Sequence, residues 1–147
     1  CALPISGLMC AFAVIPNPDW RRRFRAAARG VVNELNPFGY VACEAAYRHG
    51  QEWRRALLAY LRGNRDLVEQ AVGALPGLRL LHVEATYLAW IDCRGAGLDQ
   101  PAAHFERAGV GLSDGALFGA PGFVRLNFGC PRATLREGLA RLARAVA

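Results

Sequence analysis

The spacing of apolar residues changes once along the chain, near Pro76-Gly77, and this change restricts the fold more than any other feature. Over residues 52–75, apolar side chains recur at the spacing of one helical face. Over residues 86–91, the composition shifts to β-branched and aromatic residues, which is typical of a strand. The pattern therefore predicts an α/β chain in which one long helix, straight or bent at Gly63-Asn64, leads into a sheet.

The clearest strand signal covers residues 123–128. Because side chains alternate between the faces of a strand, Val124 and Leu126 are expected on one face and Arg125 on the other. Pro131 then predicts the start of a final helix whose apolar side includes Leu135, Leu139 and Leu142. Together these elements predict a small sheet, antiparallel or mixed, with the final helix packed across it.

Proline and glycine divide the first fifty residues into three elements. The apolar run over residues 8–15 predicts a strand that is buried on both faces. Asn17-Pro18 and Asn36-Pro37 each place a capping side chain before a proline. They predict a helix that ends near Arg29 and a second that ends before Gly50.

Shorter elements are expected between the two main strands. Asp99 is expected to cap a short helix that ends at Arg107. Residues 110–112 predict a brief strand, and the glycine-rich residues 114–122 predict a loop.

The composition is that of a globular protein whose basic residues are all arginines. Of the 147 residues, 53% are hydrophobic and 20% are charged, and the 18 basic residues include no lysine. A Schiff base to an aldehyde cofactor requires a lysine amine, which these residues do not supply. The five cysteines lack CxxC spacing, so no disulfide framework or zinc site is predicted and a reducing cytoplasm is expected. The apolar run over residues 5–15 is too short to cross a bilayer.

Arg125 is the candidate binding residue. A guanidinium in the middle of a strand offers two parallel donors that match a carboxylate, and the neighbouring glycine-rich loop can border a pocket. The alternative is a solvated arginine on an open sheet face. The net charge of +6 and the run Arg21-Arg22-Arg23-Phe24-Arg25 leave nucleic-acid binding as another alternative. No RNA-binding aromatic motif or helix-turn-helix signature accompanies that run.

The histidines and cysteines do not mark a site. His49, His82 and His104 lie far apart in the sequence without the spacing of metal ligands, so no metal site is predicted. Cys43 and Cys130 have no base beside them in the sequence and are interpreted as structural.

Three sequence blocks together resemble a known family. They are Asn36-Pro37 through Ala45-Ala46-Tyr47-Arg48-His49-Gly50, then Thr86-Tyr87-Leu88-Ala89-Trp90-Ile91-Asp92, and then Phe123-Val124-Arg125-Leu126-Asn127-Phe128-Gly129-Cys130-Pro131-Arg132. In residues and spacing, the chain from about Gly7 to its end is similar to the MalY/PatB branch of the class I/II aminotransferase-like enzymes. The third block is the most specific part of the resemblance.

The resemblance implies the C-terminal part of a fold-type-I enzyme that depends on pyridoxal 5′-phosphate (PLP). Residues 1–50 would finish the large PLP-binding domain, residues 51–76 would form an interdomain helix, and residues 77–147 a small α/β domain. Arg125 would bind the α-carboxylate of a small amino-acid substrate. Such enzymes cleave cystathionine or cysteine conjugates to pyruvate, ammonia and a thiol. A cytoplasmic homodimer without nucleic-acid or membrane partners is implied.

The chain departs from this family at the cofactor lysine. The family's Ser-Lys-x-Phe-Asn stretch would run into Cys1-Ala2-Leu3-Pro4, with Cys1 at the position of the lysine. We therefore expect a truncated sequence, with an artefactual junction in the first six residues as one explanation, and no catalysis by this chain alone.

Two other functions stay open. Within the same fold the parent protein would be an aminotransferase, which forms a keto acid only when an amino acceptor is present. In another class, the chain would be a stand-alone module that binds an anionic partner with steep salt dependence.

Overall fold

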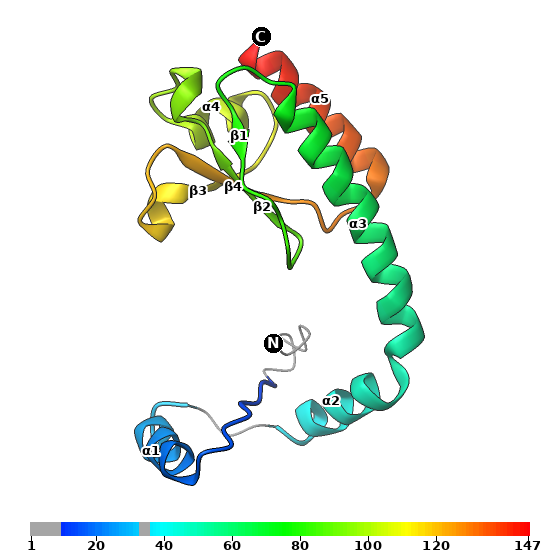
Figure 1. Ribbon diagram of the computed structural model, residues 1–147, viewed down its shortest axis with the longest axis vertical. Helices are drawn as coiled ribbons and strands as arrows, with labels where there is room; N and C mark the ends of the chain where they lie inside the picture. The colour runs from blue at the N-terminus through cyan, green and yellow to red at the C-terminus, as the bar shows by residue number, and fades with distance from the viewer. Residues whose placement is uncertain (1–9, 33–35) are drawn as a thin grey trace. The chain divides into compact units, whose positions relative to one another are not determined.

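The computed structural model describes residues 10–32 and 36–147 (Figure 1). Its helices are α1 (Pro18–Ala28), α2 (Pro37–His49), α3 (Gln51–Gly73), α4 (Pro101–Arg107) and α5 (Arg132–Val146), with short 3-10 helices η2 (Arg94–Ala96) and η3 (Gly115–Phe118). Its strands are β1 (Arg79–Leu80), β2 (Leu88–Asp92), β3 (Ser113–Asp114) and β4 (Phe123–Asn127). The chain divides into two units, Cys1–Arg55 and Ala56–Ala147, and the boundary falls inside α3. The predicted α/β class is confirmed.

Asparagine caps begin both helices of the first unit, as the sequence predicts. The Asn17 side-chain oxygen accepts hydrogen bonds from the backbone N–H groups of Asp19 at 2.9 Å and Trp20 at 3.1 Å. The Asn36 side-chain oxygen accepts one from the Gly39 N–H at 2.8 Å. Each cap satisfies backbone donors that the first helical turn leaves without a partner, and a proline follows it directly.

The strand predicted over residues 8–15 is wrong for the part that the structure describes. Residues 10–15 are neither helix nor strand, and no described strand pairs with them. A strand needs a hydrogen-bonded neighbour, which an apolar pattern alone does not provide. Phe12 and Val14 are accordingly 55% and 79% exposed. Cys1, the predicted junction in the first six residues and the start of this run lie outside the described residues.

The second unit contains a four-stranded antiparallel sheet in the order β1-β2-β4-β3. Its centre is the pair β2 and β4, which runs in register from Leu88 opposite Asn127 to Asp92 opposite Phe123. The antiparallel alternative for the small sheet is therefore confirmed. β3 adds only Ser113 and Asp114 at the edge.

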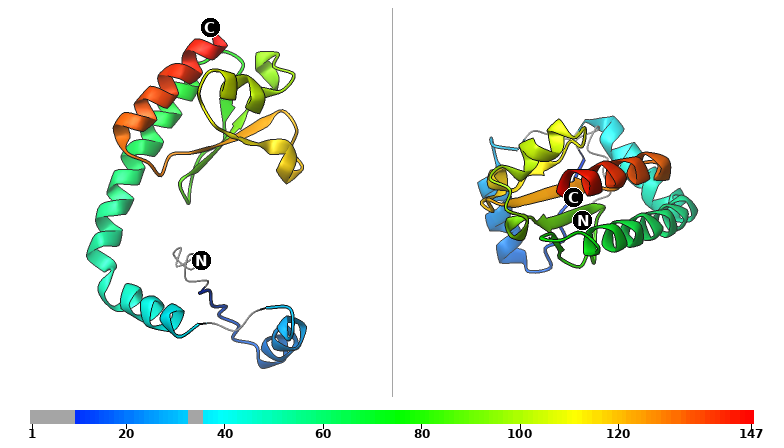
Figure 2. Two further views of the ribbon diagram at one scale, coloured as in Figure 1. Left: turned by 180° about the vertical axis from the view of Figure 1, so that it is seen from behind. Right: turned by 90° about the horizontal axis from the view of Figure 1, so that it is seen from above.

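One face of this sheet forms the core, and α3, α5 and the short α4, through Phe105, pack against it. Ala89, Ile91 and Val124 are fully buried, and Leu126 is 5% exposed. α5 contributes its leucines and α3 contributes valines to the same cluster: Leu135, Leu139, Leu142, Val68 and Val72. Figures 1 and 2 show α5 beside the second half of α3, on the same side of the sheet. The predicted packing of the final helix across the sheet is confirmed.

The long helix α3 continues through Gly63-Asn64. Asn64 is fully buried, and a Cβ atom at Gly63 would lie 2.7 Å from a guanidinium nitrogen of Arg132. These two residues are therefore packing positions and do not end the helix. Neither α3 nor any other helix among the described residues is long and apolar enough to span a membrane.

The connection between β2 and β4 differs from the prediction in two details. The residue that caps α4 is Gln100, without a side-chain hydrogen bond, because Pro101 takes the first helical position and leaves Asp99 one residue too early. Residues 110–112 form no strand, since the Val110 N–H bonds to the Phe105 carbonyl and extends the end of α4. The strand is β3, which begins at Ser113. The predicted loop over residues 114–122 contains η3.

Candidate functional site

Arg125 lies on the sheet face that α3 and α5 leave open. It occupies the middle of β4, between the buried Val124 and Leu126, so its side chain leaves the sheet on the other side. The predicted alternation is therefore confirmed. The register of the sheet places Trp90 of β2 and Ser113 of β3 on either side of Arg125.

The Arg125 side chain is half-buried and is held by neutral groups. One terminal nitrogen donates a hydrogen bond to the Ser113 hydroxyl at 3.2 Å. Its central carbon lies 4.5 Å from the centre of the Phe118 ring, so the guanidinium covers the face of that ring. Trp90 meets Phe118 edge-on, with ring centres 5.8 Å apart. Within residues 10–32 and 36–147, no carboxylate forms an ion pair with Arg125, so its charge is available to an anion.

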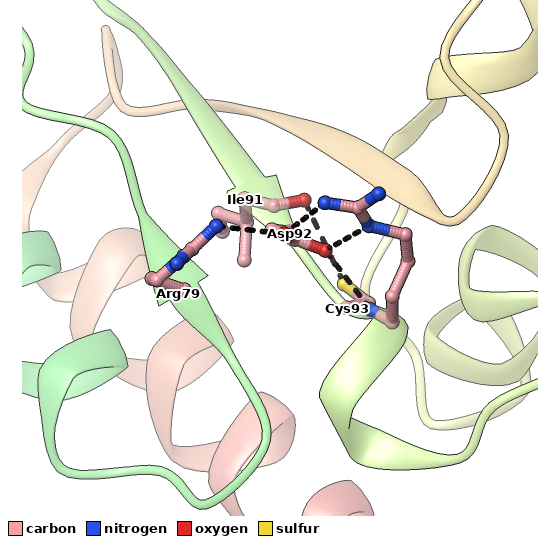
Figure 3. A network of polar contacts seen from close by, with 5 residues as sticks. Arg79, Ile91, Asp92 and Cys93 are labelled. Atoms are coloured by element: carbon pink, nitrogen blue, oxygen red, sulfur yellow. Dashed lines mark hydrogen bonds and ion pairs between the residues drawn. The ribbon is translucent and has the colours of Figure 1, made fainter.

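Arg94 differs from Arg125 because a carboxylate already occupies it. Its Nε and one Nη donate to the two Asp92 side-chain oxygens at 2.9 Å and 2.8 Å, and its backbone N–H donates to Asp92 at 3.1 Å. Arg79 approaches the same carboxylate from β1 at 3.5 Å (Figure 3). Asp92 is 6% exposed, and the bonds from Arg94 hold its pKa well below its usual range. This pair joins the end of β2 to η2 and is structural.

The Asp92 carboxylate predicts a specific sensitivity of the second unit to acid. A carboxyl whose pKa is lower in the folded than in the unfolded chain stabilises the fold above its unfolded pKa of about 3.9, and this contribution is lost as the pH falls. Asp92→Asn should therefore destabilise the chain at pH 7 and reduce the further loss of stability between pH 5 and pH 2. Urea unfolding at several pH values measures both effects.

Glu137→Gln is the matched comparison for that experiment. The Glu137 pKa is also lowered, because the side chain bonds to Arg141 at 2.8 Å, but Glu137 is largely exposed. An exposed pair contributes little to stability. If Glu137→Gln changed the acid sensitivity as much as Asp92→Asn, the assignment to the buried pair would be wrong.

Several other residues considered from the sequence have partners within their own unit. In the first unit, Arg22 pairs with Asp19 at 2.8 Å, and Arg21 donates to the Ile15 carbonyl. His82 contacts Glu69 at 3.2 Å, and a ring nitrogen of His104 lies 2.7 Å from the Ala145 carbonyl oxygen. In the part of the chain that the structure describes, no three of the His, Cys, Asp and Glu side chains gather where a metal ion could bind.

A polar latch that the sequence does not signal ties α3 to the segment between β4 and α5. The buried Asn64 donates to the carbonyl groups of Phe128 at 2.9 Å and Cys130 at 3.0 Å. Its oxygen accepts from the Arg132 Nε at 3.1 Å. The Arg132 guanidinium also covers the Tyr60 ring, and the backbone N–H of Arg132 donates to the Tyr60 hydroxyl at 2.7 Å. The partners lie more than 60 residues apart, so only the fold brings them together.

An open groove of about 500 Å³ lies beside this latch. It is mostly apolar and is lined by Leu57, Tyr60, Leu61, Tyr87, Gly129, Cys130 and Pro131. Cys130 therefore lines a groove, whereas its sequence context indicated only a structural thiol.

Comparison with known proteins identifies the family. The sequence profile described as "Aminotransferase class I and II" matches residues 2–142. The chain belongs to this family. The aminotransferase-family chain is 34% identical to cystathionine beta-lyase PatB of Bacillus subtilis, over 99% of its own length and 41% of PatB. The resemblance to the MalY/PatB branch is confirmed.

Solved structures agree with this membership and with the fold. The structure of OvoB is 49% identical, with a TM-score of 0.92, over 97% of the chain and 38% of OvoB. A putative PLP-dependent beta-cystathionase from Corynebacterium diphtheriae is 35% identical, with a TM-score of 0.85, over 99% of the chain and 40% of that protein. The fold is therefore that of the C-terminal part of fold-type-I PLP enzymes. The chain spans about two-fifths of the length of these proteins.

The residues of this aminotransferase-family chain do not fit a covalent PLP site. Relatives of the chain are PLP-dependent enzymes, and such enzymes hold the aldehyde through a lysine amine. The 147 residues contain no lysine. Arginine cannot replace it, because the guanidinium stays protonated and is not a nucleophile at neutral pH.

Proposed function

We propose that this chain is part of a PLP-dependent carbon–sulfur β-lyase, and that Arg125 binds the α-carboxylate of its amino-acid substrate. The reaction converts a cysteine conjugate such as cystathionine, with one water, into a thiol, pyruvate and ammonia. The Cα–H and Cβ–S bonds break, and the sulfur leaves with the proton. Residues 1–50 would finish the large domain, residues 51–76 would join the two domains, and residues 77–147 would form the small one.

The contacts of the Arg125 guanidinium are the observation that supports this proposal. A half-buried guanidinium without an acidic partner has donors left that an anion can bind by charge-assisted hydrogen bonds. Ser113 takes one donor of Arg125 and Phe118 covers one face, which leaves donors at the edge of a planar fork. A planar carboxylate matches such an edge with two parallel hydrogen bonds.

The lyase is favoured over the aminotransferase by PatB, which is named a cystathionine beta-lyase and aligns with nearly the whole chain. Arg125 would serve either reaction, because both act on an amino acid with a free α-carboxylate. We also propose a cytoplasmic homodimer, which rests on the family resemblance and on no contact in this chain.

A hybrid enzyme tests the reaction type. In this hybrid, the chain replaces the matching part of PatB, and the rest of PatB has to supply the lysine and the other cofactor contacts. With L-cystathionine and no amino acceptor, we expect equal amounts of pyruvate, ammonia and free thiol. A hybrid that binds PLP but forms product only after an α-keto acid is added would refute the lyase proposal and support the aminotransferase.

A further inference from the structure

We propose that Phe118 and Ser113 are positioning residues that fix the plane of the Arg125 guanidinium. The binding of a substrate carboxylate by Arg125 rests on the proposed function, but the fixed orientation of its guanidinium does not. Ser113 acts on one edge of the guanidinium and Phe118 acts on its face. The remaining edge is therefore presented in a single orientation to an incoming carboxylate.

Two contacts of different geometry are needed to fix a planar group at the end of a flexible side chain. A hydrogen bond to one terminal nitrogen still permits rotation of the guanidinium around that bond. The Phe118 ring, 4.5 Å from the guanidinium carbon, restricts this rotation because cation and ring attract most strongly when the cation lies over the ring face. Both partners are neutral, so they orient the charge without neutralising it. An acidic partner, such as Asp92 beside Arg94, would compete with the substrate.

One short segment supplies both contacts. Ser113 is paired with Arg125 in the register of β3 and β4, and Phe118 ends η3, five residues later. The Asp114 side chain accepts a hydrogen bond from the Ala116 N–H at 3.0 Å and so starts η3. Gly119, at a φ of 77°, ends it in a conformation that suits glycine.

The segment is held firmly against the sheet. A Cβ atom at Gly115 would lie 2.6 Å from the Phe123 carbonyl oxygen, so only glycine fits there. Trp90 supports Phe118 from β2 by an edge-on contact, and the Trp90 ring stacks on Phe123 at 5.8 Å. Phe118 is nevertheless 51% exposed. Its ring therefore contributes little to the core, and its specific contacts are with Arg125 and Trp90.

The test follows the Arg125 side chain by NMR in the 147-residue chain. The Arg125 Nε–Hε signal is assigned by its absence from the spectrum of the Arg125→Lys chain. In Phe118→Leu, we expect the Arg125 Nε order parameter to fall to the range of flexible groups, below about 0.6, while the backbone order parameters of β4 stay in the rigid range, near about 0.85. Phe118→Tyr keeps a ring and should keep the order. Leu117→Ala removes apolar area from the same 3-10 helix, where Leu117 is 80% exposed, and should have no effect.

A titration with sodium acetate, against sodium chloride at equal ionic strength, adds the second readout. Phe118→Leu should weaken acetate binding at Arg125 roughly three- to ten-fold, and Phe118→Tyr should restore it. If Phe118→Leu disturbs the fold, Ser113→Ala with Ser113→Thr as rescue gives the same comparison. An Arg125 side chain that stays ordered in the folded Phe118→Leu and Ser113→Ala chains would overturn the positioning role. A side chain that loosens as expected, in a chain that binds no acetate, would support the positioning role and refute the carboxylate function.

Discussion

Replacing Arg125 by alanine is expected to lower kcat/KM for cystathionine by roughly 30- to 1,000-fold in the hybrid of PatB and this chain. The change removes a charge-assisted, two-pronged contact and the alignment that it imposes on the substrate, which together contribute about 2–4 kcal/mol. PLP absorbance of the resting hybrid should hardly change, because Arg125 is expected to contact the substrate and not the cofactor. Steady-state rates and the absorption spectrum give both quantities.

Two further variants separate the geometry of Arg125 from its charge. Arg125→Lys keeps the charge but lacks the planar fork, so it should recover little of the lost activity. Arg136→Ala removes the same charge from an exposed position of α5 and should leave kcat/KM within about two-fold of the unchanged hybrid. Full activity of the Arg125→Ala hybrid would show that another group binds the carboxylate.

Replacing Asn64 by leucine is expected to lower the free energy of unfolding of the second unit by about 2–4 kcal/mol. Leucine has the same number of side-chain heavy atoms in the same branched arrangement but makes none of the three hydrogen bonds of this fully buried side chain. The Phe128 carbonyl group then loses its partner in the buried interior, and the Cys130 carbonyl group and the Arg132 Nε lose theirs at partly buried positions. Hydrogen exchange of the β4 amides reports on this unit specifically.

Gln70→Leu is the matched control for that substitution. It makes the change from amide to leucine at an exposed position of the same helix α3. Surface substitutions of this kind usually change the free energy of unfolding by less than about 0.5 kcal/mol. If the β4 amide hydrogens exchanged at equal rates in the two variants, the latch between Asn64 and Arg132 would have no role in stability.

The sequence alone was sufficient where structure depends on neighbouring residues. Asn17 and Asn36 cap their helices because the capped N–H groups lie two or three residues away. The two faces of β4 follow from alternation, so the outward position of Arg125 was predictable. The same local reasoning misplaced the cap of α4 by one residue, because the effect of Pro101 outweighed that of Asp99.

Local pattern was insufficient where a segment needs a distant partner. The run over residues 8–15 has the composition of a buried strand, yet residues 10–15 pair with no described strand. The candidate site shows the same limit: Arg125 could be identified as a candidate, but its orientation by Ser113 and Phe118 could not. That contact depends on the register between β3 and β4 and on the turn of η3.

The sequence by itself determined the main helices and the caps of α1 and α2, the two main strands and their faces, the family resemblance, and the absence of a lysine from these residues. Only the tertiary structure decided which arginines are free to bind an anion. Arg94 and Arg125 both cover a phenylalanine ring. Arg94 has its carboxylate two residues earlier, in Asp92, whereas the fold brings only a hydroxyl, that of Ser113 in β3, to Arg125. The physical reason is that the charge available at a site depends on its spatial neighbours, which strand register and helix packing select from distant parts of the chain.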